Sequence, residues 1–340
     1  MAANRGRDIV VVAASAGGIE ALRGLLSQIP ETVPAALLVV LHVPAAGGKV
    51  LPRILARAGR LPASAASDGE TPLPGHVYVA PPDRHILLVG DKIRLSQGPR
   101  HNGHRPAADP LFISAALSGG PHTIAVVLSG TLDDGAAGAA AVERRGGVVA
   151  VQDPGESAYD GMPRAAMAAT RGARVMRLAQ LAAFIDTESR RPLAGPAVLP
   201  DPDLDRQLSV FLEPIPPPAA RPSPWSGVTC PECGGPLGQG AAASVPVRFE
   251  CQAGHAWSAE SLLAAQAAGI ERALWAAVLR LEERARLHQV LADTAEHQGY
   301  PLSAGGFRGS ARSARSSARQ IRRLLELPAE IEIAARTDDE

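Results

Sequence analysis

The chain has 340 residues, and its 34 Lys and Arg residues balance 34 Asp and Glu residues, so the formal net charge is zero. This length suffices for one sizeable α/β domain and a smaller unit, and the balanced charge gives no argument for binding nucleic acid. The N-terminal MAANRGRDIV lacks the apolar region of a secretory signal, and we identify no apolar stretch long enough to span a bilayer. We therefore expect a cytoplasmic protein without membrane insertion.

Residues 8 to 186 alternate short apolar runs with helical patterns. The apolar runs are rich in Val, Leu and Ala, and they cover residues 8–14, 35–41, 123–129 and 146–152. Helical spacing covers residues 18–29, 136–146 and 178–190. Runs that are apolar on both faces are typical of parallel strands covered by helices on both sides. We therefore predict a doubly wound α/β domain with a mostly parallel sheet over residues 1–187, whose ligand site lies at the carboxyl ends of the strands.

Residues 85–96 have a different pattern, with two strands joined through Gly90-Asp91. This predicts a β-hairpin.

The C-terminal part divides into four segments. Residues 188–226 are dense in proline, which favours neither sheet nor helix, so we predict a linker there. A small Cys/His module follows over residues 227–257, then a helical region over 258–328 and a tail over 329–340. Apolar spacing predicts a long helix after Ser258, which is a suitable N-cap, and the basic stretch 313–327 predicts a shorter helix that folds back.

Ser15 lies where the first apolar run gives way to a helix. The sequence Ala13-Ala14-Ser15-Ala16-Gly17 is related to the Gly-x-Ser-x-Gly nucleophile elbow. Small residues on both sides allow a sharp turn that exposes the hydroxyl, and the following helix directs backbone N–H groups toward negative charge. The serine could instead cap the helix. A phosphate cradle is less favoured, because no Gly-x-Gly-x-x-Gly or Walker lysine is present.

Two further strands end in residues that could work with this serine. His42 ends the second apolar run and could take the proton of Ser15. Asp133 or Asp134 follows the third run and could orient the histidine. Each residue also has a structural interpretation, as a buried histidine or as a helix N-cap. The order Ser, His, Asp differs from that of the α/β-hydrolases, so a triad here would belong to another fold.

Six segments together identify a family. They are AASAGGIEAL, VVLHVP, GHVYVAPPDRHILL, HRPAADPLFISAA, VVLSGTLDDGA and VQDPGESAYDGMPRAAM. In this order and spacing, the first 185 or so residues resemble the catalytic domain of the CheB-type chemotaxis methylesterases. The resemblance implies Ser15 as nucleophile, His42 as base and Asp134 as the carboxylate. It also implies the backbone N–H of Thr131 as an oxyanion donor, with that of Ala16 as a second candidate.

The resemblance implies an activity as well. The family hydrolyses glutamate γ-methyl esters on the cytoplasmic domain of chemoreceptors, releasing methanol, and can deamidate glutamine. It needs no catalytic cofactor. We expect this protein-glutamate methylesterase activity here, with the methylated chemoreceptor as partner.

The chain departs from the family pattern at three points, and two alternative functions stay open: the departures at Ala16 and Leu132 leave an adaptor possible, and the sequence does not identify the groove that binds the substrate. Ala16 replaces a threonine, and Leu132 replaces a glycine in the turn that carries the oxyanion donor. The chain also begins at the catalytic strand, so we expect no N-terminal receiver domain and no control through its phosphorylation. The alternatives are a weak or inactive adaptor that binds signalling partners, and a serine hydrolase with another ester or amide substrate.

Other polar residues in these segments carry weaker predictions. Arg105 and Arg164 could contact the substrate, or they could be solvent-exposed arginines at the rim of the site. His101 and His104 flank a glycine, and we do not assign them to a metal.

The three cysteines lie together in the C-terminal module. Cys230-x2-Cys233 is followed by Cys251-x3-His255, a set of three thiolates and one imidazole that matches a closed, tetrahedral structural zinc site. We therefore predict a zinc ribbon, similar to the C-terminal extension of some receiver-less CheB-like proteins. We expect it to dock other signalling proteins. Nucleic acid is the alternative that we do not expect, because only the basic stretch 308–323 supports it.

Overall fold

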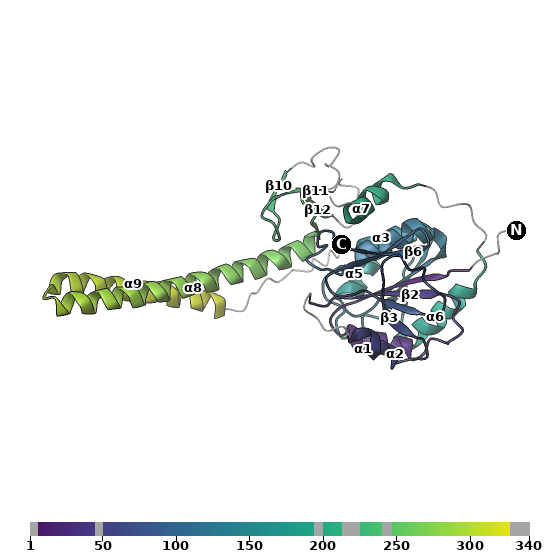
Figure 1. Cartoon of the computed structure of the whole chain (residues 1–340), viewed down its shortest axis with the longest axis horizontal. Coiled ribbons are helices and arrows are strands. Elements are labelled where there is room, and N and C mark those ends of the chain that lie inside the picture. The colour runs from purple at the N-terminus through teal and green to yellow at the C-terminus, as the bar shows by residue number, and fades with distance from the viewer. Residues whose placement is uncertain (1–5, 45–49, 194–199, 213–224, 240–246, 327–340) are drawn as a thin grey trace, which may run out of the picture. The chain divides into compact units, whose positions relative to one another are not determined.

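The structure is a computed structural model, which describes residues 6–44, 50–193, 200–212, 225–239 and 247–326 (Figure 1). The chain divides into two compact units, residues 1–263 and 264–340. The proposed tail over 329–340 lies outside the described residues, as do linker residues 194–199 and 213–224.

A seven-stranded sheet forms the centre of the first unit. Its order is β3-β4-β2-β1-β7-β8-β9, and every neighbouring pair is parallel. The strands are β1 Ile9–Ala14, β2 Ala36–Leu41, β3 Ala63–Ala65, β4 Val77–Val79, β7 Thr123–Val127, β8 Val148–Gln152 and β9 Arg174–Met176. From β1 the chain adds strands on one side, beginning with β2, and then crosses to add β7 on the other side of β1. In sheets of this kind, ligands bind outside the carboxyl ends of the strands at the point of such a reversal.

Helices cover both faces of this sheet, which confirms the doubly wound fold. They are α1 Gly18–Leu26, α2 Leu51–Ala56, α3 Ala108–Gly119, α4 Ala136–Arg144, α5 Gly161–Ala169 and α6 Leu178–Arg190. Alternate residues of β1 face opposite sides. Val10 and Val12 pack with α1, α2 and α6, whereas Val11 and Ala13 pack with α3, α4 and α5. Burial of both faces explains why these strands have continuous apolar sequences.

The expected hairpin is present as β5 His85–Val89 and β6 Lys92–Ser96, a separate two-stranded antiparallel sheet.

The prediction that residues 188–226 lack regular structure is wrong at both ends, where α6 runs to Arg190 and β10 begins at Trp225, and over one internal helix. Helix α7 spans Pro202–Leu212, and its Leu208 and Phe211 pack on Leu87 of the hairpin. The side chain of Asp201 accepts the N–H of Leu204 at 3.2 Å. Proline at the first helical position after an aspartate cap is a favourable helix start, so the sequence carried a signal that its proline content obscured.

The Cys/His module forms an antiparallel four-stranded sheet in the order β10-β11-β12-β13. The strands are β10 Trp225–Thr229, β11 Pro236–Gln239, β12 Arg248–Cys251 and β13 Ala256–Ser258. Helix α8, Ala259–His297, begins directly after β13, and the hydroxyl of Ser258 accepts the N–H of Ser261 at 3.0 Å. This is the expected N-cap.

The second unit contains the rest of α8 and helix α9, Pro301–Glu326. The two helices run side by side after a turn at Gly299 (Figure 1). Small buried residues line their contact, among them Ala285, Ala292, Ala304 and Ala311. The fold-back helix is therefore present, but it is longer than the basic stretch that suggested it.

The expectation about membrane-spanning stretches needs a correction. Helix α8 has an 18-residue window with a mean hydropathy of 1.3, which is long and apolar enough to cross a membrane by length and composition alone. Alanine supplies much of this apolar character. Glu271 and Arg272 lie within the helix, and a charged side chain near the bilayer centre costs about 2.5–3.5 kcal/mol.

Candidate active site

Three side chains from different strand ends form a hydrogen-bonded chain. Ser15 follows β1, His42 follows β2, and Asp134 lies in the turn between β7 and α4. The Oγ atom of Ser15 lies 3.1 Å from Nδ1 of His42. Nε2 of His42 lies 2.7 Å from Oδ2 of Asp134. The histidine can therefore donate from Nε2 to the carboxylate while its Nδ1 accepts the serine proton.

The turn after β1 holds Ser15 by its backbone. Its N–H donates to the carbonyl of Ser129 at 2.9 Å, and its own carbonyl accepts the N–H of Gly18 at 2.9 Å. Gly17 has φ 70°, and a Cβ there would lie 2.8 Å from Oγ of Ser129. Glycine adopts this positive φ without strain, and it has no Cβ to meet the Ser129 hydroxyl. The N-cap of α1 is Gly17, without a side-chain cap bond. The alternative in which Ser15 caps this helix is therefore not what the structure shows.

Asp134 is buried and receives several hydrogen bonds. Its carboxylate accepts the N–H groups of Ala108 at 2.6 Å and Asp109 at 3.3 Å, both at the start of α3, and Nδ2 of Asn102 at 3.2 Å. Burial by itself would raise the pKa of this carboxyl, but the hydrogen bond and charge of His42 and the backbone N–H of Ala108 outweigh it and lower the pKa. Asp134 is therefore an ionised partner for His42.

Asp133 points elsewhere, which separates the two aspartates that spacing could not distinguish. Its Oδ1 accepts the hydroxyl protons of Ser258 at 2.7 Å and Ser261 at 2.9 Å. Burial raises its pKa, and these two hydrogen bonds oppose the rise. Neither aspartate caps α4, whose N-cap is Gly135 without a side-chain bond.

The turn expected to carry oxyanion donors lies close to Ser15. Among the residues that the structure describes, the N–H groups of Ala16 and Thr131 donate to no other protein group. Gly130 lies between the serine and α5, where a Cβ would be 3.0 Å from Cβ of Ser15 and 2.1 Å from Sδ of Met162. The backbone can therefore approach the nucleophile only because position 130 is glycine.

Leu132 has φ 60°, the left-handed region that the expected glycine would occupy without strain. This conformation costs an L-residue about 1–2 kcal/mol. A Cβ at Gly161 would lie 2.8 Å from the Leu132 nitrogen, so α5 begins directly against this turn. The substitution thus leaves the left-handed turn in place.

Sequence reasoning left three neighbours of the triad unassigned. The ring of His104 stacks on that of His42, with centroids 3.8 Å apart and planes 9° apart. Burial, followed by the charge of His42, lowers the pKa of His104 to about 4. His101 is buried, and burial lowers its pKa, whereas burial raises the pKa of nearby Asp109. The two histidines lie in the polar sequence before α3 and Asp109 in its first turn, and residue spacing alone could not connect these positions to the triad.

The two candidate arginines are engaged in other contacts. Arg105 donates to the carboxylate of Asp83 at 2.8 Å and to the carbonyls of Gln97 and Gly98. Arg164 pairs with Asp160 at 2.6 Å on an exposed face of α5, where its side chain is 67% exposed. These pairs show how each guanidinium is held, and a role in substrate contact stays a prediction.

The four expected metal ligands lie together in the C-terminal module. The ligand atoms of Cys230, Cys233, Cys251 and His255 all lie within 4.8 Å of one another. Sγ of Cys251 lies 3.6 Å from Sγ of Cys233 and 3.5 Å from Nδ1 of His255. Thiolates bound to zinc at about 2.3 Å in a tetrahedron stand about 3.8 Å apart. The arrangement therefore fits a metal ion of this kind.

A parallel α/β sheet whose strand ends bring a serine, a histidine and an aspartate into one hydrogen-bonded chain has the architecture of a serine hydrolase. The family model for CheB methylesterase matches residues 10–185, and the chain belongs to this family. The crystal structure of the Thermotoga maritima CheB methylesterase catalytic domain is similar, with 32% sequence identity and a TM-score of 0.51, over 53% of this chain and 97% of that one.

Curated relatives agree with this assignment. A protein-glutamate methylesterase/protein-glutamine glutaminase of Myxococcus xanthus is 39% identical over 183 residues, covering 54% of this chain and 52% of the relative. One of Anaeromyxobacter dehalogenans is 44% identical over 167 residues, covering 48% of each. The chain therefore spans about half the length of the curated relatives that it matches.

Proposed function

We propose that this protein is a protein-glutamate methylesterase with Ser15 as its nucleophile. The observation that carries the proposal is the hydrogen-bonded chain from Ser15 through His42 to Asp134. Its membership of the CheB methylesterase family supports the ester substrate. The names of its relatives add glutamine deamidation as a second reaction of the same site.

The hydrogen-bonded chain supports the following mechanism. Nδ1 of His42 takes the proton of Ser15 while Oγ attacks the ester carbonyl, and Asp134 stabilises the imidazolium that forms. The N–H groups of Thr131 and Ala16 bind the oxyanion, each contributing about 3–4 kcal/mol. Methanol leaves with the proton from His42, and the same histidine then activates water to hydrolyse the glutamyl-enzyme. With glutamine the leaving group is ammonia.

The substrate is a glutamate γ-methyl ester on the cytoplasmic domain of a chemoreceptor, and the protein acts in the cytoplasm. The test is methanol release from a methylated receptor fragment, comparing the protein with Ser15→Ala. Release that requires the hydroxyl supports the proposal. No release from the folded protein favours the adaptor, and release only from other esters or amides favours a different hydrolase.

We propose further that Cys230, Cys233, Cys251 and His255 hold a structural zinc ion. A sheet of this size has too little core to be stable without such a crosslink. Zinc here would supply folding free energy, and the closed ligand set leaves no position for substrate. Metal analysis of the purified protein should give one zinc per chain, which Cys233→Ser loses.

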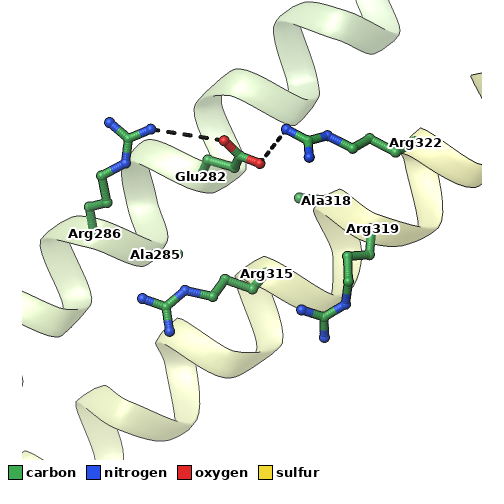
Figure 2. A pocket seen from close by; sticks show the side chains of 7 residues that line it. All are labelled: Glu282, Ala285, Arg286, Arg315, Ala318, Arg319 and Arg322. Carbon is green, nitrogen blue, oxygen red and sulfur yellow. Dashed lines mark hydrogen bonds and ion pairs between the residues drawn. The ribbon is translucent and has the colours of Figure 1, made fainter.

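We also propose that the helical pair of the second unit binds an acidic segment of a signalling partner. Glu282, Ala285, Arg286, Arg315, Ala318, Arg319 and Arg322 line a groove of about 430 Å³ between α8 and α9 (Figure 2). Glu282 pairs with Arg322 at 2.6 Å and with Arg286 at 3.9 Å. Among the described residues, Arg315 and Arg319 have no acidic partner, so they leave positive charge for carboxylates. Replacing both by glutamine should weaken binding of an acidic peptide at low salt without changing the reactivity of Ser15.

A further inference from the structure

The C-terminal module contacts the turn that carries the candidate carboxylate. Asp133, only 8% exposed, accepts both hydroxyl protons of Ser258 and Ser261, which lie at the end of β13 and in the first turn of α8. Ser258 at the same time caps α8 through the N–H of Ser261. One buried carboxylate therefore fixes the start of the long helix to the residue that precedes Asp134.

Asn102 makes a second connection between the module and the site. Its side chain is buried, its Oδ1 accepts the N–H of Ser258 at 2.9 Å, and its Nδ2 donates to Asp134 at 3.2 Å. Its backbone N–H donates to the carbonyl of Ala256 at 2.8 Å. Asn102 also has φ 51°, a conformation that asparagine adopts more readily than most residues. A single side chain thus joins strand β13 to the carboxylate that orients His42.

These contacts matter because the turn is costly to hold. Asp133 is a buried carboxylate, which is expensive without hydrogen-bond donors. Leu132, directly before it, has the strained left-handed backbone, and Thr131 precedes that. Without the two serine hydroxyls, the turn could relax by moving Asp133 toward solvent and Leu132 out of the left-handed region. Such a movement would displace both the Thr131 amide and Asp134.

We propose that β13 and the first turn of α8 act as a clamp that holds the Thr131–Asp134 turn in its catalytic geometry, so that hydrolysis requires a folded C-terminal module. Ser258, Ser261 and Asn102 are positioning residues in this proposal. The proposal rests on the proposed esterase function and adds a means of control. Loss of the metal proposed for the module, or displacement of the module by a partner, would lower the rate of hydrolysis without any change at Ser15 itself.

The test uses the full-length protein with Ser258→Ala and with Ser258→Ala/Ser261→Ala. We expect kcat for methanol release to fall about 10-fold in the first variant and about 100-fold in the second, with KM changed less than 3-fold, because the clamp acts on the turn that stabilises the transition state. Ser258→Thr keeps a hydroxyl and should stay within 3-fold of the native kcat. Ser226→Ala is the matched control, since the Ser226 hydroxyl donates to Leu237 inside the module.

Reaction of Ser15 with a fluorophosphonate probe is the second readout, since it does not depend on the methyl ester substrate. Slower labelling in the double variant, together with native labelling in Ser258→Thr and Ser226→Ala, supports the clamp even if the native protein releases no methanol. In that case only the proposed substrate fails. Native labelling rates and native kcat in the double variant would overturn the clamp.

Discussion

Gly130→Ala tests how closely the backbone must approach Ser15. A Cβ at position 130 would lie 2.1 Å from Sδ and 2.9 Å from Cγ of Met162, and 3.0 Å from Cβ of Ser15. Met162 is fully buried, so its side chain can move aside only by displacing its own neighbours. We therefore expect the added methyl to push the Gly130–Thr131 backbone away from the serine.

The expected cost has two parts. Overpacking of a filled core destabilises by about 1–3 kcal/mol, and loss of one oxyanion donor lowers kcat by about 10²–10³-fold. Urea unfolding measures the first part and ester hydrolysis the second. In a Met162→Ala background the clash with sulfur is gone and the 3.0 Å contact with Cβ of Ser15 remains. We therefore expect Gly130→Ala to cost less there than in the native background, and the two substitutions should be strongly coupled.

Gly305→Ala provides the control for glycine replacement itself. No atom lies within 4 Å of the Cβ position at Gly305, on an exposed face of α9, so alanine should stabilise this helix by up to about 1 kcal/mol without changing activity. Native stability and native kcat in Gly130→Ala would refute the packing argument, and so would a loss that Met162→Ala leaves unchanged.

Two further predictions concern stability. Burial lowers the pKa of His85 to about 4 from 6.5, so the folded state binds fewer protons than the unfolded state, and the free energy of unfolding falls by about 3 kcal/mol as the pH falls from 6.5 to 4. His85→Asn should remove this part of the pH dependence, measured by urea unfolding at pH 7, 5.5 and 4. An unchanged slope of unfolding free energy against pH would contradict the assignment to His85. Arg7 pairs with the buried Glu188 at 2.6 Å, and Glu188 also has longer pairs with Arg174 at 3.6 Å and Arg191 at 3.5 Å. Arg7→Met should therefore cost about 1–3 kcal/mol in the same assay, with part of the loss recovered by Arg7→Met/Glu188→Leu. Equal stability of the single and double variants would count against a buried charge.

Much of the catalytic half could be predicted because its strands are buried on both faces. Continuous apolar sequences such as residues 35–41 identify such strands, and parallel order places their polar ends at one edge. Ser15 and His42 follow from that rule. The choice of Asp134 over Asp133 needed the family resemblance, because neighbouring residues in a turn point in directions that spacing does not determine.

Other elements depend on tertiary contacts that local sequence does not show. Strands β3 and β9 are three residues long, too short to display a period. Helix α7 is stabilised by packing on the hairpin, in a segment whose proline content suggested a linker. Asn102 lies more than 150 residues from Ser258, and only the folded chain brings them together.

We propose Ser15 as a nucleophile that His42 activates, and every step of the proposed hydrolysis depends on this pair. The most direct measurement is reaction of the protein with a fluorophosphonate, followed by mass spectrometry of the peptide that contains residue 15. We expect one adduct per chain on Ser15, none in Ser15→Ala, and labelling slowed by at least about 100-fold in His42→Gln, a typical size for loss of a general base. An adduct on another residue, or labelling of Ser15 that does not depend on His42, would contradict this proposal.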